Sequence, residues 1–183
     1  GFGAVYGGRI SSIMDISSKD GNKKQFSGKA SISPFGSKLM VEGPLKKLSD
    51  DGGASISYVF SGKTSYLEQS SKFLYSYIDS AGLPFNFTDL YGKVSVNGEN
   101  GSKVNFFGFN YNDQVRYKAV SDLNWDAWGA GTNFMVLPSS SPVLIMGKFN
   151  ISDYQISLAE NDPNSGEQMP VSYTHLRAHE TRS

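Results

Sequence analysis

The stretch Leu90 to Asn112, LYGKVSVNGENGSKVNFFGFNYN, shows most clearly how this chain folds. From Leu90 to Asn97, apolar residues and glycine alternate with polar residues, which is the period of a β-strand with two unlike faces. The Asn100-Gly101 pair that follows is a strong hairpin signal, and strand-like sequence resumes from Lys103 to Asn112. The stretch therefore predicts two antiparallel strands joined by a tight turn.

The same alternation recurs along most of the chain and predicts an all-β antiparallel fold. A further short strand is expected near Arg9 to Ser17, ahead of the first long one, and Ser65 to Tyr77 could form a short helix. A polar loop is expected from Asp113 to about Asn124. The seven main strands are predicted at residues 25–33, 38–43, 54–63, 90–97, 103–112, 128–136 and 143–152.

Composition excludes several classes of protein. The 183 residues include 38% apolar residues, enough for a folded protein rather than a disordered one. The 17 basic and 17 acidic residues cancel, so the chain lacks the basic surplus of a nucleic-acid-binding protein. With no cysteine there is no disulfide or thiol nucleophile, and no run of about 18 apolar residues predicts a membrane helix.

Strand length and loop spacing favour a membrane barrel over a soluble β-sandwich. Several of the predicted runs reach the 9 to 11 residues that a tilted strand needs to cross the hydrocarbon layer, whereas strands of globular proteins are usually nearer 5 or 6 residues. The last five strands are joined long, short, long, short, as in outer-membrane barrels. We therefore expect a fragment of an antiparallel transmembrane β-barrel.

The two faces of the predicted strands agree with this expectation. One face carries mainly Ser, Lys, Asn, Gln and Gly, as a wet or plug-contacting lumen requires, because lipid cannot satisfy such groups. Several aromatic residues near strand ends could form interfacial belts, and ordinary core or edge positions are the alternative. They are Tyr58, Phe87, Trp125, Trp128, Phe149 and Tyr154.

No catalytic or metal-binding set stands out. Outside the last residues there is neither His nor Cys, so no nucleophilic triad or His-rich metal site can be proposed. The carboxylates fall at predicted loops or strand ends, where solvated turn residues are expected. We expect no enzyme activity, no cofactor and no metal.

The last residues are interpreted separately. The stretch Val171 to Thr181, VSYTHLRAHET, looks like the translation of a transposon-type sequencing adapter, so we expect residues 171–183 to be non-native and exclude them from fold reasoning. The alternative is a natural polar tail in which His175 and His179 could hold a metal on one face of a helix.

The opening residues resemble a known family. In Gly1 to Ile16, GFGAVYGGRISSIMDI, the residues Ala4, Tyr6, Gly7, Gly8 and Arg9, followed by Ile16, Ser18 and Lys19, are similar to the end of the plug domain in TonB-dependent outer-membrane receptors of the Bacteroidetes, SusC-like type. Later segments resemble the first barrel hairpins of this group. They are Phe26 to Gly28, Leu39 to Pro44 and Ser61 to Leu67.

The resemblance implies a domain organisation, a function and partners. Residues 1–24 would end the plug, and residues 25–170 would be the first strands of a barrel of about 22 strands. The receptor would lie in the outer membrane of a Gram-negative bacterium and take up a scarce nutrient, such as a glycan or siderophore. Energy would come from TonB, which contacts a part of the receptor outside this chain. Further partners would be outer-membrane lipid and a SusD-like surface lipoprotein; nucleic acid is not expected.

Two groups of residues are candidates for function. Tyr6, Gly7, Gly8 and Arg9 would form the plug–barrel junction, where Arg9 could pair with a wall carboxylate such as Glu42. In the segment Thr64 to Phe85, expected to be external, Tyr66, Tyr75 and Tyr77 are candidate ligand or partner contacts.

Two other classes remain open at this point. A soluble β-sandwich that binds a ligand or glycan would also give alternating strands and aromatic-rich loops. An outer-membrane enzyme barrel would need a catalytic set elsewhere in the gene.

Overall fold

The computed structural model describes residues 17–49, 53–74, 77, 83–117, 121–139, 143–160 and 168–181. The opening segment therefore lies outside the described residues, and with it the expected first strand and the junction residues Tyr6, Gly7, Gly8 and Arg9.

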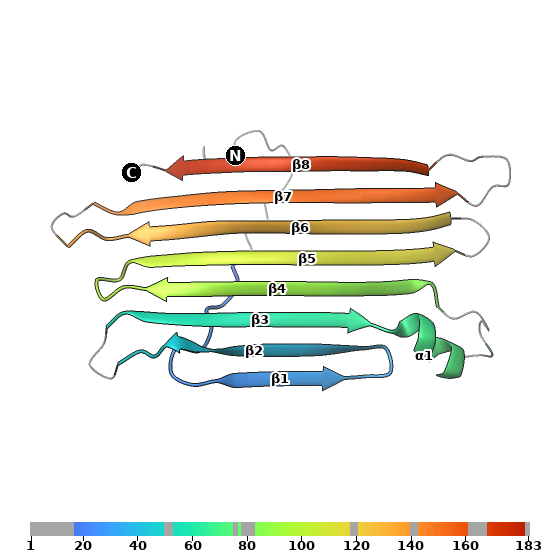
Figure 1. Cartoon of the computed structure of the whole chain (residues 1–183), viewed down its shortest axis with the longest axis horizontal. Helices are drawn as coiled ribbons and strands as arrows, with labels where there is room; N and C mark the ends of the chain where they lie inside the picture. The colour runs from blue at the N-terminus through green and yellow to red at the C-terminus, as the bar shows by residue number, and fades with distance from the viewer. Residues whose placement is uncertain are drawn as a thin grey trace, which may run out of the picture.

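The described chain forms one antiparallel sheet (Figure 1). Its strand order, β1 to β8, follows the sequence, so β1 and β8 lie at opposite edges and the sheet is open. The strands are β1 (Ser27–Ile32), β2 (Gly36–Lys46), β3 (Ser55–Ser65), β4 (Phe85–Asn97), β5 (Lys103–Tyr117), β6 (Ser121–Val136), β7 (Ile145–Glu160) and β8 (Gln168–Thr181).

The seven predicted main strands are confirmed as β1 to β7, and the expected helix is α1 (Leu67–Leu74). The Asn-Gly signal is also confirmed, because the turn between β4 and β5 places Gly101 at a φ of 85°, which glycine adopts without steric cost. The eighth strand was not predicted. It pairs with β7 through the stretch that was excluded, and its backbone is extended rather than helical as a His-x-x-x-His site on a helix would require. That residues 171–183 are non-native stays a prediction.

The predicted loop from Asp113 to Asn124 is wrong. Strand β5 continues to Tyr117 and β6 starts at Ser121, so only residues 118–120 separate them. Strand β7 likewise extends well beyond the predicted end at Ser152. Polar residues in these extensions suggested a loop, but their backbones pair with each other through most of the predicted loop.

The two faces of the sheet differ sharply in burial. The cross-strand register assigns each side chain to one of two faces. Face A carries Ile56, Phe60, Leu90, Val94, Phe106, Phe134 and Phe149. Face B carries Ser57, Val59, Lys93, Ser95, Asn105, Asn133 and Lys148. Apart from glycines, the buried strand residues in the described ranges are polar with one exception, Val59, and they lie on face B. On face A, in contrast, Phe60 is 43% exposed.

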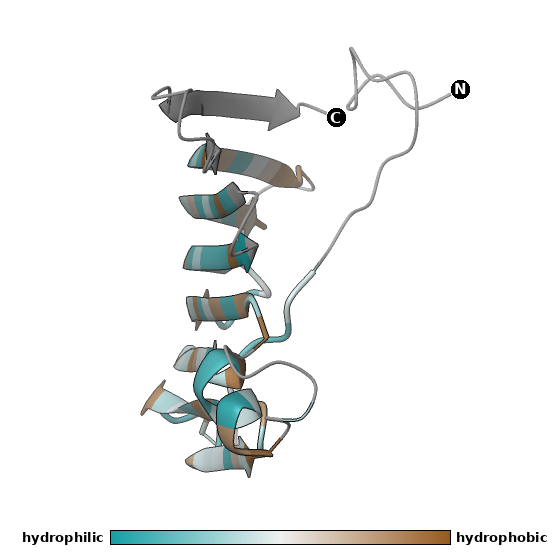
Figure 2. Cartoon of the chain, turned by 90° about the vertical axis from the view of Figure 1, so that its right-hand side faces the viewer, coloured by the Kyte–Doolittle hydropathy of each residue, from teal (hydrophilic) through white to brown (hydrophobic). Residues whose placement is uncertain are grey.

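Face B is covered in part by the chain that precedes β1. Seen edge-on, the described strands form one layer, and this leading segment runs along one side of it (Figure 2). Gly21 is buried so closely against Tyr58 that an added Cβ would lie 2.9 Å from the Tyr58 backbone nitrogen. Residues 17–25, called the leading segment below, therefore pack against face B of the sheet.

Aromatic rings on β5 cover glycines on β6. The register pairs Phe107 with Gly131 and Phe109 with Gly129, and a Cβ at either glycine would lie 2.7 Å or less from the facing ring. Such ring-over-glycine pairs fill the space that a missing side chain leaves in a sheet. Among the described residues, no helix is long and apolar enough to cross a membrane.

Candidate functional site

The leading segment is held on face B by ion pairs around Asp20. Its carboxylate lies 3.0 Å from the Lys93 ammonium and 2.6 Å from that of Lys103, and it accepts a hydrogen bond from the Ser95 hydroxyl at 3.1 Å. Lys93, whose side chain is only 6% exposed, also donates to the Ser18 carbonyl at 2.8 Å. One carboxylate thus joins the segment to both β4 and β5.

These contacts set the protonation of Asp20. Burial by itself raises the pKa of this carboxyl group, but hydrogen bonds and charge attraction from Lys103 and Lys93 outweigh it and lower the pKa from 3.8 to about 2. Asp20 is therefore ionised at neutral pH, and it gives the two lysines a partly buried counter-charge.

A second ion pair involves the carboxylate that was expected to bind Arg9. The Lys19 ammonium lies 2.7 Å from Glu42 on β2. In the described structure Glu42 therefore pairs with Lys19. Arg9 lies outside the described residues, so its pairing with Glu42 stays a prediction.

The side chains on face A change from mostly apolar to polar part-way along the strands. The residues Leu90, Asn110, Trp128 and Asp153 form one row across β4 to β7. From this row toward the β4–β5 turn, face A is mostly apolar. Beyond it, face A is polar, with Asn112, Gln114, Asn124, Asp126, Gln155 and Ser157.

Face B changes in the opposite sense. Near the β4–β5 turn it is more polar, with Asn97, Lys103, Asn105, Asn133 and Lys148, although Phe107, Phe109, Met135 and Met146 also lie there. Beyond the row it is mostly apolar, with Tyr111, Val115, Leu123, Trp125, Ile156 and Leu158, apart from Asp89 and Asp113. The two faces therefore exchange polarity at about the same level on neighbouring strands.

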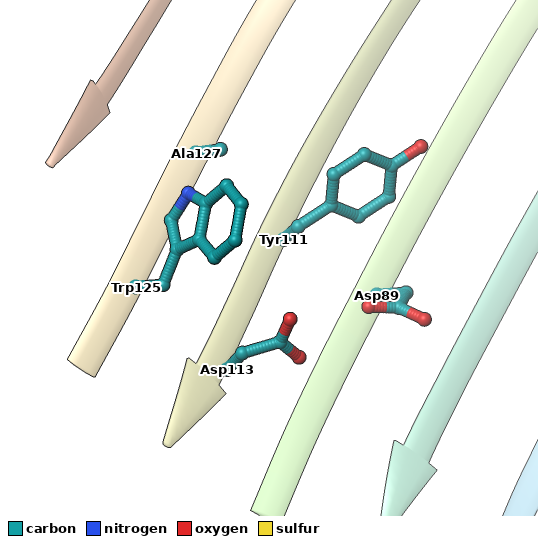
Figure 3. Close-up of a pocket in the computed structure, with 5 residues that line it drawn as sticks. All are labelled: Asp89, Tyr111, Asp113, Trp125 and Ala127. Atoms are coloured by element: carbon teal, nitrogen blue, oxygen red, sulfur yellow. The ribbon is translucent and has the colours of Figure 1, made fainter. Parts of the chain in front are cut away.

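A pocket lies on face B just beyond this level (Figure 3). It has a volume of about 430 Å³ and is lined by Asp89, Tyr111, Asp113, Trp125 and Ala127 from three adjacent strands. The register pairs Asp89 with Tyr111 and Tyr111 with Ala127, and the next row on this face pairs Asp113 with Trp125. The volume is within the range of small-molecule sites.

Burial and a neighbouring carboxylate change the protonation of Asp113. Burial and the nearby charge of Asp89 raise the pKa of Asp113, and the more distant Lys63 lowers it by less. The pKa of the Tyr111 hydroxyl is raised by burial and by Asp89 and Tyr91. The pocket is thus an acidic, aromatic-walled site.

Of the three candidate tyrosines, Tyr66 and Tyr77 do not line this pocket. The Tyr66 hydroxyl donates to the carbonyls of Ser33 and Gly36, so it anchors the start of α1 to the β1–β2 turn. Tyr77 is 79% exposed beyond the helix, and Tyr75 lies outside the described residues. A role of these residues in binding stays a prediction.

The aromatic residues expected near strand ends lie on both faces of the sheet, and a belt at a membrane interface stays a prediction. Tyr58, Trp128 and Phe149 lie on face A, but Phe87, Trp125 and Tyr154 lie on face B, where lipid contact is not available if face A meets the membrane. Sequence reasoning missed the pocket because Asp113 was placed in a loop. Asp113 is two residues after Tyr111, so the period of a strand could have placed both side chains on the same face.

Within the described ranges, no group of three or more His, Cys, Asp or Glu residues is positioned to hold a metal ion. Comparison of the chain with protein-family models, with curated proteins and with solved structures finds no match.

Proposed function

We propose that this chain is part of the wall of a β-barrel in the outer membrane of a Gram-negative bacterium, and that the barrel belongs to a TonB-dependent receptor for a scarce nutrient. The exchange of polarity between the two faces is the observation that supports a membrane wall most directly. Lipid requires an apolar outward surface only across the hydrocarbon layer, and polar groups can face outward again beyond it.

The height of the apolar band fits this proposal. On β6 the band on face A runs from Trp128 to Val136, which corresponds to roughly 27 Å along a strand at about 3.4 Å per residue. A tilt of about 40° reduces this to roughly 20 Å, close to the apolar band of about 25 Å in outer-membrane barrels. The polar strand extensions would then stand outside the membrane.

The leading segment supports the assignment to a plugged receptor. In such a receptor the plug lies inside the barrel, so the chain that leaves it has to pass along the lumen side of the wall. Asp20 and Lys19 bind face B, the side away from the proposed lipid. The family itself is supported by the resemblance of Ala4 to Lys19. TonB, a surface lipoprotein and the nutrient would be partners of the whole receptor.

The two tryptophans of the chain provide a test of the membrane wall. They lie three positions apart on β6, with Trp128 on face A at the edge of the band and Trp125 on face B. The chain is inserted into phosphatidylcholine vesicles whose acyl chains are brominated near the headgroup, because bromine quenches tryptophan fluorescence only on contact. Trp125→Phe leaves Trp128 as the reporter, and Trp128→Phe leaves Trp125.

We expect strong quenching of Trp128 and little quenching of Trp125. Equal quenching of both would contradict the orientation of the sheet. No quenching of either, with a water-soluble folded monomer, would favour the β-sandwich instead.

A further inference from the structure

The pocket on face B suggests a class of ligand. Its walls combine two carboxylates with the rings of Tyr111 and Trp125, and Figure 3 shows these side chains on one side of the sheet. No cationic side chain in the described part of the chain lies within ion-pair distance of Asp113. The site is therefore rich in groups that attract a cation.

The neighbouring side chains show what such groups bind. One strand away, the Lys63 ammonium lies 4.3 Å from the centre of the Phe87 ring and 3.9 Å from the Asp89 carboxylate. Here an ammonium group of the chain itself sits between a ring and a carboxylate, which is a favourable cation–π arrangement. Asp113, Tyr111 and Trp125 repeat the combination of rings and carboxylate without a cation from the described chain.

We propose that this pocket binds an organic cation, with an ammonium group held between the Asp89 and Asp113 carboxylates and the rings of Tyr111 and Trp125. The inference rests on the proposed function, in which face B lines a water-filled lumen that a ligand can enter. It deepens that function by assigning a class of ligand, a positively charged one, to a place just beyond the membrane level.

Electrostatics favours a cation over a neutral ligand of the same shape. Asp89 pairs across the strands with Tyr111, so the Asp113 carboxylate, one row further along β5, is its diagonal neighbour, and Lys63 on β3 lies opposite Asp89. Mutual repulsion of the carboxylates contributes to the raised pKa of Asp113, and a bound cation would relieve this repulsion. Acid protonates Asp113 and removes the charge, so binding should weaken as the pH falls through the pKa of this group.

Trp125 provides the signal for a test. The Trp128→Phe chain, folded in micelles of a polyoxyethylene detergent, is titrated with choline while Trp125 fluorescence is followed. The comparison ligand is 3,3-dimethyl-1-butanol, which has the shape of choline without its charge, and sodium chloride controls for ionic strength. We expect saturable binding of choline and binding of the neutral alcohol that is weaker by roughly tenfold, as a cation–π and charge contribution predicts.

Substitutions then locate the site. Asp113→Asn and Asp89→Asn should each weaken choline binding by roughly fivefold to tenfold, and Tyr111→Leu should do so without changing a charge. Asp122→Asn, on face A of β6, is the matched control and should leave binding unchanged. Circular dichroism checks that each variant keeps its strand content, and Tyr111→Leu serves as the test if a carboxylate variant unfolds.

The proposal would be overturned if choline gave no saturable signal or if the neutral alcohol bound equally well. Tighter binding of methyl glucoside than of choline would also overturn it and would point to a sugar site. These outcomes are separate from the membrane test, because Trp128 can be quenched by brominated lipid whether or not the pocket binds choline.

Discussion

Gly131 shows how a single residue decides the packing of the sheet. A Cβ at this position would lie 2.7 Å from the Phe107 ring and 2.8 Å from the Phe149 carbonyl oxygen. The ring could move, but the carbonyl belongs to the backbone of the neighbouring strand and cannot move without disturbing the pairing of β6 with β7. The glycine is therefore required by close approach, not by backbone conformation.

We predict that Gly131→Ala lowers the free energy of unfolding by about 1–3 kcal/mol, the usual cost of overpacking. Gly92→Ala is the control, because its Cβ would meet only the Phe60 ring, at 3.8 Å. Its stability should change by less than about 1 kcal/mol. Urea titration of both variants in detergent micelles measures the difference, and equal midpoints would contradict the packing argument.

The packing of the leading segment on the sheet depends on ion pairs. Its ion pairs with the sheet are those of Asp20 with Lys93 and Lys103 and that of Lys19 with Glu42, and Asp20 also accepts a hydrogen bond from Ser95. An ionised carboxylate among partly buried lysines stabilises the packed segment only while it keeps its charge.

We predict that Asp20→Asn destabilises the folded chain by up to about 2 kcal/mol at pH 7, the amount that corresponds to a pKa lowered from 3.8 to about 2. Because the pKa is lower in the folded state, the stabilisation is complete above pH 3.8 and is lost as the pH falls toward 2. Urea midpoints should therefore differ between wild type and variant at pH 7 and converge near pH 2.

Glu99→Gln is the matched control for this experiment. Glu99 is exposed in the β4–β5 turn and takes no part in the ion pairs of Asp20, so its substitution should leave the urea midpoint unchanged at both pH values. A difference between wild type and Asp20→Asn that persisted near pH 2 would show that the carboxylate charge is not the cause.

The molecule as a whole has an apolar face without a protein partner among the described residues. Face A exposes large side chains along the band, including Leu39, Phe60, Phe106, Trp128 and Phe149. The sheet is also open, with β1 and β8 at its edges. Exposed apolar faces and unpaired edges promote association between chains.

We predict that the isolated chain aggregates in water and acquires stable strand content in lipid vesicles or detergent. Sedimentation and circular dichroism with and without vesicles measure this. A soluble monomer that unfolds cooperatively in water would contradict the prediction and favour a sandwich in which face A is covered.

The sequence by itself determined the all-β fold, the seven main strands and the short helix. These are local properties, because a period of two residues is set by the geometry of each strand alone. It could not determine where strands end at Asp113 to Asn124, since polar residues pair in strands as readily as they form loops when water faces them. Only the tertiary structure decided that Lys19 and Asp20 pair with β2, β4 and β5, and that Asp89, Tyr111 and Trp125 share a pocket, because register across strands brings together residues far apart in the chain.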